Sequence, residues 1–102
     1  MINVSVYYQV KPEFVATNKV NIEKFLNDFK NLDSNKFSYS IFLKDDGVTF
    51  VHNSSYTDAE IQKEVLNVPS FLEFQKQRDD SGLNNSHKVE VLEFIGSSKK
   101  IL

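Results

Sequence analysis

Four stretches of the chain alternate hydrophobic and polar residues, which is the period of a β-strand with two different faces. In the first stretch, residues 2–10, one side carries Ile2, Val4, Val6, Tyr8 and Val10. The same period returns in residues 37–44, 48–56 and 87–95. The pattern therefore predicts four strands.

Turn and helix signals predict how the first three strands are connected. Pro12 ends the first strand, because proline has no N–H to donate to a ladder, and it suits the first turn of a helix. Apolar residues then recur every three or four positions through residues 13–32, which predicts an amphipathic helix. Asp45, Asp46 and Gly47 form a tight-turn sequence, so we expect the second and third strands to pair as an antiparallel hairpin.

The second half of the chain predicts two shorter helices and the last strand. Thr57 and Glu60 have the spacing of a capping box, which predicts a helix that starts there and runs through Asn67. Pro69 interrupts the helical pattern, and residues 70–78 predict a further short helix. The residues from about 97 onward are expected to form a tail.

The resulting order, β-α-β-β-α-β, predicts a ferredoxin-like α+β domain spanning residues 1–102, in which two helices cover one face of a four-stranded antiparallel sheet. The other face of the sheet also carries apolar and aromatic residues, so leaving it wet would expose a large patch. A second copy of the chain would cover it most simply. We therefore expect a homodimer that forms through the sheet face.

Composition removes several classes of function. The chain has 12 Lys and Arg against 14 Asp and Glu, so it has no basic field that would favour nucleic acid. It has no cysteine and only two histidines, so we expect no metal site. No apolar run is long enough to cross a membrane, and the N-terminus lacks a signal-peptide pattern. These features predict a cytoplasmic protein without membrane partners.

Three groups of residues resemble the antibiotic-biosynthesis monooxygenase-like family of dimeric α+β barrels. They are V-K-P at residues 10–12, T-F-V at residues 49–51, and the block from Tyr56 to Phe74, which holds an aromatic residue, a capped helix, a proline and an F-x-x-F pair. The resemblance implies a dimeric barrel. It also implies cofactor-independent oxygenation of a small phenolic or quinol-like compound.

The residues that carry chemistry in that family are partly replaced. Many members have a tryptophan where this chain has Tyr56, and histidines where it has Val65 and Ser70. In the haem-degrading branch a histidine stands near the positions of Gln75 or Gln77, so haem iron would lack its axial ligand here. The resemblance therefore predicts no haem and no other cofactor.

Cofactor-free oxygenation of a phenol needs a base and polar contacts for the oxygen-bearing anion. His52 is the only side chain in the predicted sheet interior whose pKa naturally lies near neutrality, and alternation places Ser54 and Tyr56 on the same face. Alternation alone leaves open which sheet face meets the helices. The candidates are His52 and Tyr56 as catalytic residues, and Asn53, Ser54, Ser5 and Tyr7 as substrate contacts.

Two functions remain open from the sequence. One is a cofactor-independent monooxygenase in which His52 acts as base. The other is a non-catalytic dimeric barrel that binds a small aromatic or hydrophobic molecule. Family resemblance favours the first, and the missing tryptophan and helix histidines favour the second.

Overall fold

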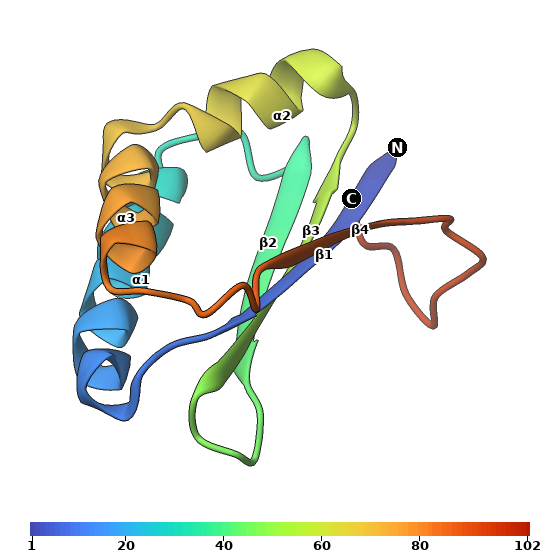
Figure 1. The fold of residues 1–102 in the computed structure, drawn as a ribbon. Coiled ribbons are helices and arrows are strands. Elements are labelled where there is room, and N and C mark those ends of the chain that lie inside the picture. The colour runs from blue at the N-terminus through green and yellow to red at the C-terminus, as the bar shows by residue number, and fades with distance from the viewer.

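The computed structural model describes all 102 residues and has the ferredoxin-like α+β fold. Its four strands form one antiparallel sheet in the order β2-β3-β1-β4 (Figure 1). The strands are β1 (Ile2–Gln9), β2 (Phe37–Leu43), β3 (Thr49–Tyr56) and β4 (Lys88–Leu92). The first and last strands are shorter than the alternation predicts, and β4 ends three residues early.

The helices lie on one side of the sheet, as Figure 1 shows. A short 3-10 helix, η1 (Pro12–Phe14), leads into α1 (Val15–Phe29), while α2 (Ala59–Leu66) and α3 (Pro69–Asp80) connect β3 to β4. Pro12 and Pro69 each stand in the first turn of their helix, where a missing N–H costs nothing. The helix predicted for residues 13–32 is therefore divided, and its α-helical part ends at Phe29.

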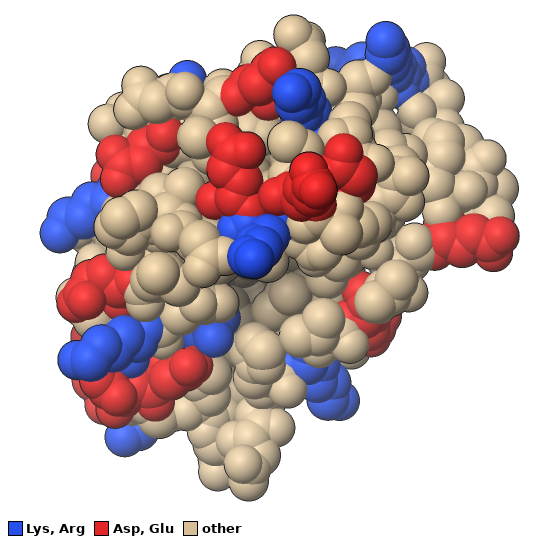
Figure 2. Space-filling model, turned by 90° about the horizontal axis from the view of Figure 1, so that it is seen from above, with Lys and Arg blue, Asp and Glu red and all other residues tan.

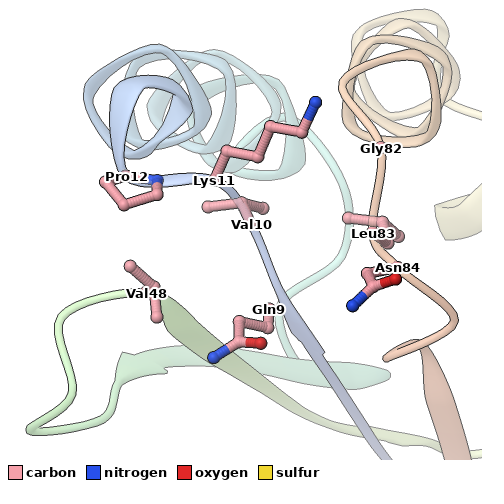
Figure 3. A pocket seen from close by; sticks show the side chains of 8 residues that line it. All are labelled: Gln9, Val10, Lys11, Pro12, Val48, Gly82, Leu83 and Asn84. Carbon is pink, nitrogen blue, oxygen red and sulfur yellow. The ribbon is translucent and has the colours of Figure 1, made fainter.

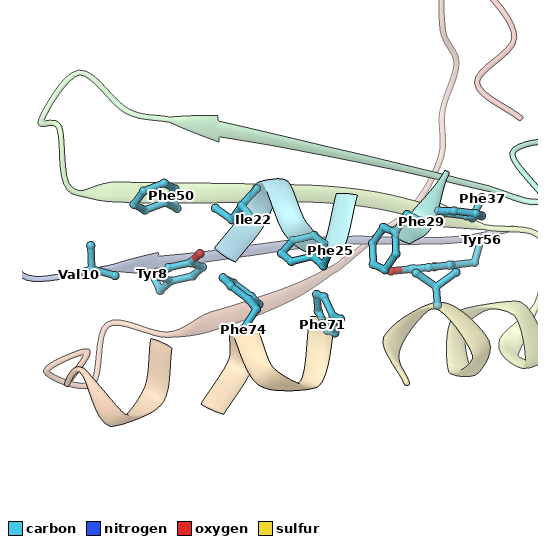
Figure 4. Packing of buried hydrophobic residues seen from close by; sticks show 11 residues of the cluster. Tyr8, Val10, Ile22, Phe25, Phe29, Phe37, Phe50, Tyr56, Phe71 and Phe74 are labelled. Carbon is cyan, nitrogen blue, oxygen red and sulfur yellow. The ribbon is translucent and has the colours of Figure 1, made fainter. Parts of the chain in front are cut away.

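Alternation decides which side chains face these helices. The antiparallel register puts Val6 opposite His52 and Tyr8 opposite Phe50, all on the helix-facing side. Phe25 from α1 and Phe74 from α3 pack against this side. Figure 4 shows the resulting layer of aromatic rings between sheet and helices.

The outward face of the sheet is more polar than we expected from the sequence. Hydroxyl and amide side chains dominate it, since the same alternation that gathers the apolar residues inside gathers the polar ones outside. Its apolar members include Phe42, Val51 and Leu92. The tail after β4 leaves the sheet on the side away from the helices (Figure 1), and Ile101 helps line a hollow with Ser40 and Asn53 of this face.

Exposed apolar side chains gather instead along β4 and the tail. They are Val89, Val91, Leu92, Phe94, Ile95 and Ile101, of which Val91 and Ile95 are 78% and 87% exposed. β4 is an edge strand, paired on one side only. On the face shown in Figure 2, basic and acidic side chains are interspersed. None of the helices has the length and hydrophobicity that crossing a membrane would require.

The α2 cap differs from the sequence prediction by one residue. Asp58, not Thr57, is the N-cap, and its Oδ1 accepts a hydrogen bond from the Ile61 amide at 2.9 Å. Thr57 still continues the pairing at the end of β3, because its backbone N–H donates a hydrogen bond to the Lys36 carbonyl. A carboxylate is also the better cap electrostatically, since it meets the positive end of the helix dipole.

We expect Asp58→Ala to lower the free energy of unfolding by about 1 kcal/mol, because a helix N-terminal amide loses its partner. Thr57→Ala is the matched control and should change it by less than about 0.5 kcal/mol. Urea denaturation measures both. A larger loss in Thr57→Ala than in Asp58→Ala would contradict this assignment of the cap.

Candidate functional site

A cavity of about 190 Å³ lies between the helix-facing side of the sheet and helices α2 and α3. Single-ligand pockets are usually larger, so this one suits a compound of about one aromatic ring. Strand residues form its floor and helix residues its roof. Its lining consists of Val4, Val6, Tyr39, His52, Ser54, Tyr56, Gln62, Leu66, Phe71, Gln75, Arg78, His87 and Val89.

His52 is buried at the centre of a chain of hydrogen bonds. Its Nε2 lies 2.8 Å from the Tyr8 hydroxyl, and its Nδ1 lies 2.8 Å from the Tyr39 hydroxyl. Asn18 of α1 donates from Nδ2 to the same Tyr8 hydroxyl at 3.0 Å. Both ring nitrogens of His52 are therefore engaged by phenols, and neither points freely into the cavity.

The two ring nitrogens of His52 play different roles, because a neutral imidazole carries a single N–H. One nitrogen donates to a tyrosine oxygen and the other accepts from a tyrosine hydroxyl, and the tautomer determines which of Tyr8 and Tyr39 is the donor. In both tautomers Tyr39 is bonded to His52 and lines the cavity.

Burial keeps every member of the chain uncharged at neutral pH. Desolvation, together with the nearby charge of Arg78, lowers the pKa of His52 to about 3. Desolvation also raises the pKa of Tyr8 and of Tyr39. The pKa of Tyr56 is raised for the same reason. His52 is thus a neutral hydrogen-bonding residue here.

Arg78 contributes the one full charge in the cavity wall, since no Lys, Asp or Glu lines it. Its side chain is only 8% exposed. The guanidinium carbon lies 5.1 Å from the ring centre of Tyr8 and 5.4 Å from that of Phe74, as in a cation–π contact. The guanidinium forms a salt bridge of 3.0 Å with the Asp79 carboxylate, and the Asp79 side chain is 60% exposed.

The predicted site residues divide between the two sheet faces. His52, Ser54 and Tyr56 line the cavity together. Asn53, Ser5 and Tyr7 do not share it, because they occupy the alternate positions of the same strands.

On the outward face these three residues bond to their neighbours instead. The Ser5 hydroxyl donates to Asn53 Oδ1 at 2.9 Å, and the Tyr7 hydroxyl donates to the Glu90 carboxylate. Their predicted role as substrate contacts would therefore belong to a different surface from that of His52.

Tyr39, Arg78 and His87 line the cavity but are not among the site residues that the sequence predicts. Arg78 stands in the last turn of α3, where cations are ordinarily solvated, and His87 lies just before β4. His87 is exposed, yet its ring stacks against Tyr8 with centroids 6.5 Å apart. Helical spacing from Phe71 and Phe74 to Arg78 was the available signal, because i, i+3 and i+7 share one face.

The other hollows carry less chemistry. A larger one, about 600 Å³, opens where the end of β1 meets the segment after α3 (Figure 3). Lys11 is its single charged lining residue, and Gln9, Leu83 and Asn84 are among the others. No group of His, Asp and Glu side chains is arranged to hold a metal ion.

Comparison with solved structures supports the fold. An antibiotic biosynthesis monooxygenase superposes with a TM-score of 0.79 at 12% identity, covering 94% of this chain and all of that one. A candidate antibiotic biosynthesis monooxygenase from Bacteriodes thetaiotaomicron gives 0.82 at 10% identity, covering 97% and 93%. One from Nitrosomonas europaea gives 0.78 at 15% identity, covering 94% and 100%.

These similarities confirm the predicted ferredoxin-like α+β fold and the structural resemblance to antibiotic-biosynthesis monooxygenases. At 10–15% identity they define the fold class and not the reaction. No family model matches the sequence. No curated protein sequence matches it either.

The buried His52 predicts a pH-dependent stability. Above pH 6.5 His52 is neutral in both states and contributes no pH dependence. Between pH 6.5 and about pH 3, His52 is protonated in the unfolded chain but stays neutral in the folded protein. We expect the free energy of unfolding to fall by about 1.4 kcal/mol per pH unit in that range.

Urea denaturation of parent and His52→Gln at pH 7 and pH 5 measures this term. His52→Gln should be the less pH-sensitive of the two. His87→Gln is the matched control: His87 also has a lowered pKa but is exposed, so its variant should keep most of the parent's dependence. Equal dependence in parent and His52→Gln would show that His52 is protonated in the folded protein.

Proposed function

We propose that the protein is a cofactor-independent monooxygenase of a small phenolic or quinol-like compound. The observation that carries the proposal is the cavity itself, which combines aromatic walls with hydroxyl groups on a buried sheet face. Structures with this fold that are named antibiotic biosynthesis monooxygenases lend support. The substrate would lie among Tyr39, Tyr56 and Phe71, which line that space.

The reaction can balance without a protein-bound redox group. A phenol and O2 give a quinone and water: one oxygen atom becomes the new carbonyl oxygen, and the other leaves as water with the hydrogens of the C–H and O–H bonds. The substrate supplies all the electrons. The protein's task is to hold the phenol, exclude bulk water and stabilise developing negative charge on oxygen.

In this proposal His52 is a positioning residue. Its ring nitrogens are occupied by Tyr8 and Tyr39, so it acts on a substrate through the Tyr39 hydroxyl. Tyr39 is the group that would touch the substrate oxygen. A hydrogen bond from a fixed, partly desolvated donor stabilises an oxyanion more than water does.

One observation favours the second candidate, a non-catalytic barrel that binds a small aromatic molecule. The cavity has no carboxylate, and its central imidazole has no free nitrogen to accept a substrate proton. Thermal shift with non-oxidisable phenols tests binding separately from turnover. Binding raises the free energy of unfolding by RT ln(1 + [L]/Kd).

Oxygen consumption with a panel of quinols and phenols tests the proposed reaction. We expect Tyr39→Phe to lower kcat by about 10²-fold, the usual loss when one oxyanion donor is removed. His52→Gln should also lower it, since Tyr39 loses its fixed partner. Tyr7→Phe removes a phenol hydroxyl from the outward face and serves as the matched control. Absence of turnover by the parent across the panel would favour the binding barrel.

We further propose that the protein is a homodimer in which a second copy covers the outward sheet face, β4 and the tail. Exposed apolar residues are found there, among them Phe42 and Leu92 of the outward face and Ile95 of the tail, which is 87% exposed. Full burial of each of these side chains against a second copy would stabilise the dimer by about 1.5–3 kcal/mol.

Light scattering at micromolar concentration should therefore give about twice the chain mass of 11.8 kDa. Leu92→Asp should shift the protein towards monomer, because Leu92 lies on the outward face and a charge would be buried in the interface. Leu72→Asp is the matched control, as Leu72 is a leucine of nearly equal exposure on α3, 46% against 45%. A parent protein that stays monomeric would refute the assembly.

A further inference from the structure

Two neighbouring rows of side chains cross the helix-facing side of the sheet from β3 through β1 to β4. Each row begins with a polar side chain on β3 and continues with a valine on β1 and another valine on β4. The rows consist of Ser54, Val4 and Val91, and of His52, Val6 and Val89. Because β4 is the edge strand, both rows run from a polar centre to an apolar margin of the sheet.

The cavity between sheet and helices covers these rows only in part. Its lining includes every member except Val91. Val89 is 57% exposed and Val91 is 78% exposed, so helices α2 and α3 roof the polar end of the rows and leave the two valines of β4 uncovered. We call these two valines the β4 shelf. The shelf is continuous with the cavity, since Val89 belongs to both.

The charged side chains of β4 turn to the other face of the sheet. Glu90 accepts a hydrogen bond from the Tyr7 hydroxyl, and Lys88 Nζ lies 6.0 Å from the centre of the Tyr7 ring. Leu92 shares this outward face, so the second copy proposed above would meet β4 there. The β4 shelf therefore carries no charge and lies on the opposite side from the proposed dimer contact.

We propose that the ligand of the cavity is amphiphilic: a one-ring phenol or quinol that bears an aliphatic chain, with the chain lying on the β4 shelf. The inference rests on the proposed function and narrows its substrate class. The cavity of about 190 Å³ suits about one ring, so a chain on that ring extends past the cavity margin. At the margin the chain meets Val89 and Val91, and covering apolar surface there is favourable for both.

Strand geometry limits the useful length of the chain. Neighbouring strands lie about 4.8 Å apart, and residues two apart on one strand lie about 7 Å apart. A chain that leaves a ring above Val6 therefore covers the β4 shelf with roughly five or six carbons. Further carbons would pass the edge of the sheet, where no strand follows.

A series of 4-alkylphenols, from 4-methylphenol to 4-octylphenol, tests the β4 shelf. Isothermal titration under nitrogen measures their binding without oxygen chemistry. Full burial of one methylene tightens binding by about fourfold, so contact on one side only should give about twofold. We expect the affinity to rise by about twofold per carbon up to roughly six carbons and then to level off.

Two results with the parent protein would overturn the proposal. One is equal affinity along the whole series, which would mean that the chain touches no protein surface. The other is a rise that continues unchanged to 4-octylphenol, because nonspecific partition has no length limit.

Substitutions locate the chain. Val91→Ser should remove the gain of the longer phenols and leave the affinity for 4-methylphenol unchanged, since Val91 lies outside the cavity lining. Val91→Thr keeps the β-branched shape that suits a strand and should show a smaller loss of the same kind. Val20→Ser is the matched control, because Val20 is an exposed valine on α1.

Leu92→Ser tests the opposite face of the same strand and should keep the full dependence on chain length. Loss of that dependence in Leu92→Ser or Val20→Ser, and not in Val91→Ser, would contradict the β4 shelf. A second copy seated on the shelf would show as a shift of Val91→Ser towards monomer in light scattering, and it would also refute the ligand site.

The same series separates this inference from the proposed reaction. Binding of 4-methylphenol without any gain from longer chains would refute the β4 shelf and leave the monooxygenase proposal intact. Chain-dependent binding without oxygen consumption in air would keep the shelf and refute the reaction. Failure of every member of the series to bind would refute the shelf together with the cavity as a phenol site.

Discussion

The site depends on one buried constraint, the imidazole of His52 held between two phenol hydroxyls. An uncompensated polar ring at this depth would cost several kcal/mol, and the Tyr8 and Tyr39 bonds remove that cost. They also place the residues, because β1, β2 and β3 must keep one register for all three side chains to meet. A slip of one residue would turn His52 to the outward face. The polar chain therefore specifies both the sheet and the cavity that the sheet floors.

Asn18 extends this constraint to the helical layer. It is a fully buried amide on α1, and its bond to Tyr8 ties the helix to β1. Its own Oδ1 has no partner, so one buried acceptor remains unsatisfied beside the bonded Nδ2 donor. Core packing and the polarity of the cavity are thus set by the same few atoms.

Strand periodicity was enough to predict the fold, but it could not predict the site completely. Alternation put His52, Ser54 and Tyr56 on one face because a strand has a strict two-residue period, yet that symmetry says nothing about which face the helices cover. The sequence singles out His52 because the pKa of histidine in water lies near neutrality, but burial lowers that pKa in the folded protein. Helical spacing from Phe71 and Phe74 puts Arg78 on the apolar face of α3, but its burial also depends on the Tyr8 ring of β1, which only the tertiary structure brings to it.

The bare edge of β4 has a consequence for how the chain behaves in a crowded solution. An edge strand presents a row of unpaired N–H and C=O groups, and here apolar side chains lie beside that row on both faces. Lys88 and Glu90 interrupt the apolar sequence with alternating charges, as residues that discourage unspecific strand pairing commonly do. Replacing these two charges with neutral residues would turn a protected edge into a template for aggregation, and at Glu90 it would also remove the acceptor of the Tyr7 hydroxyl.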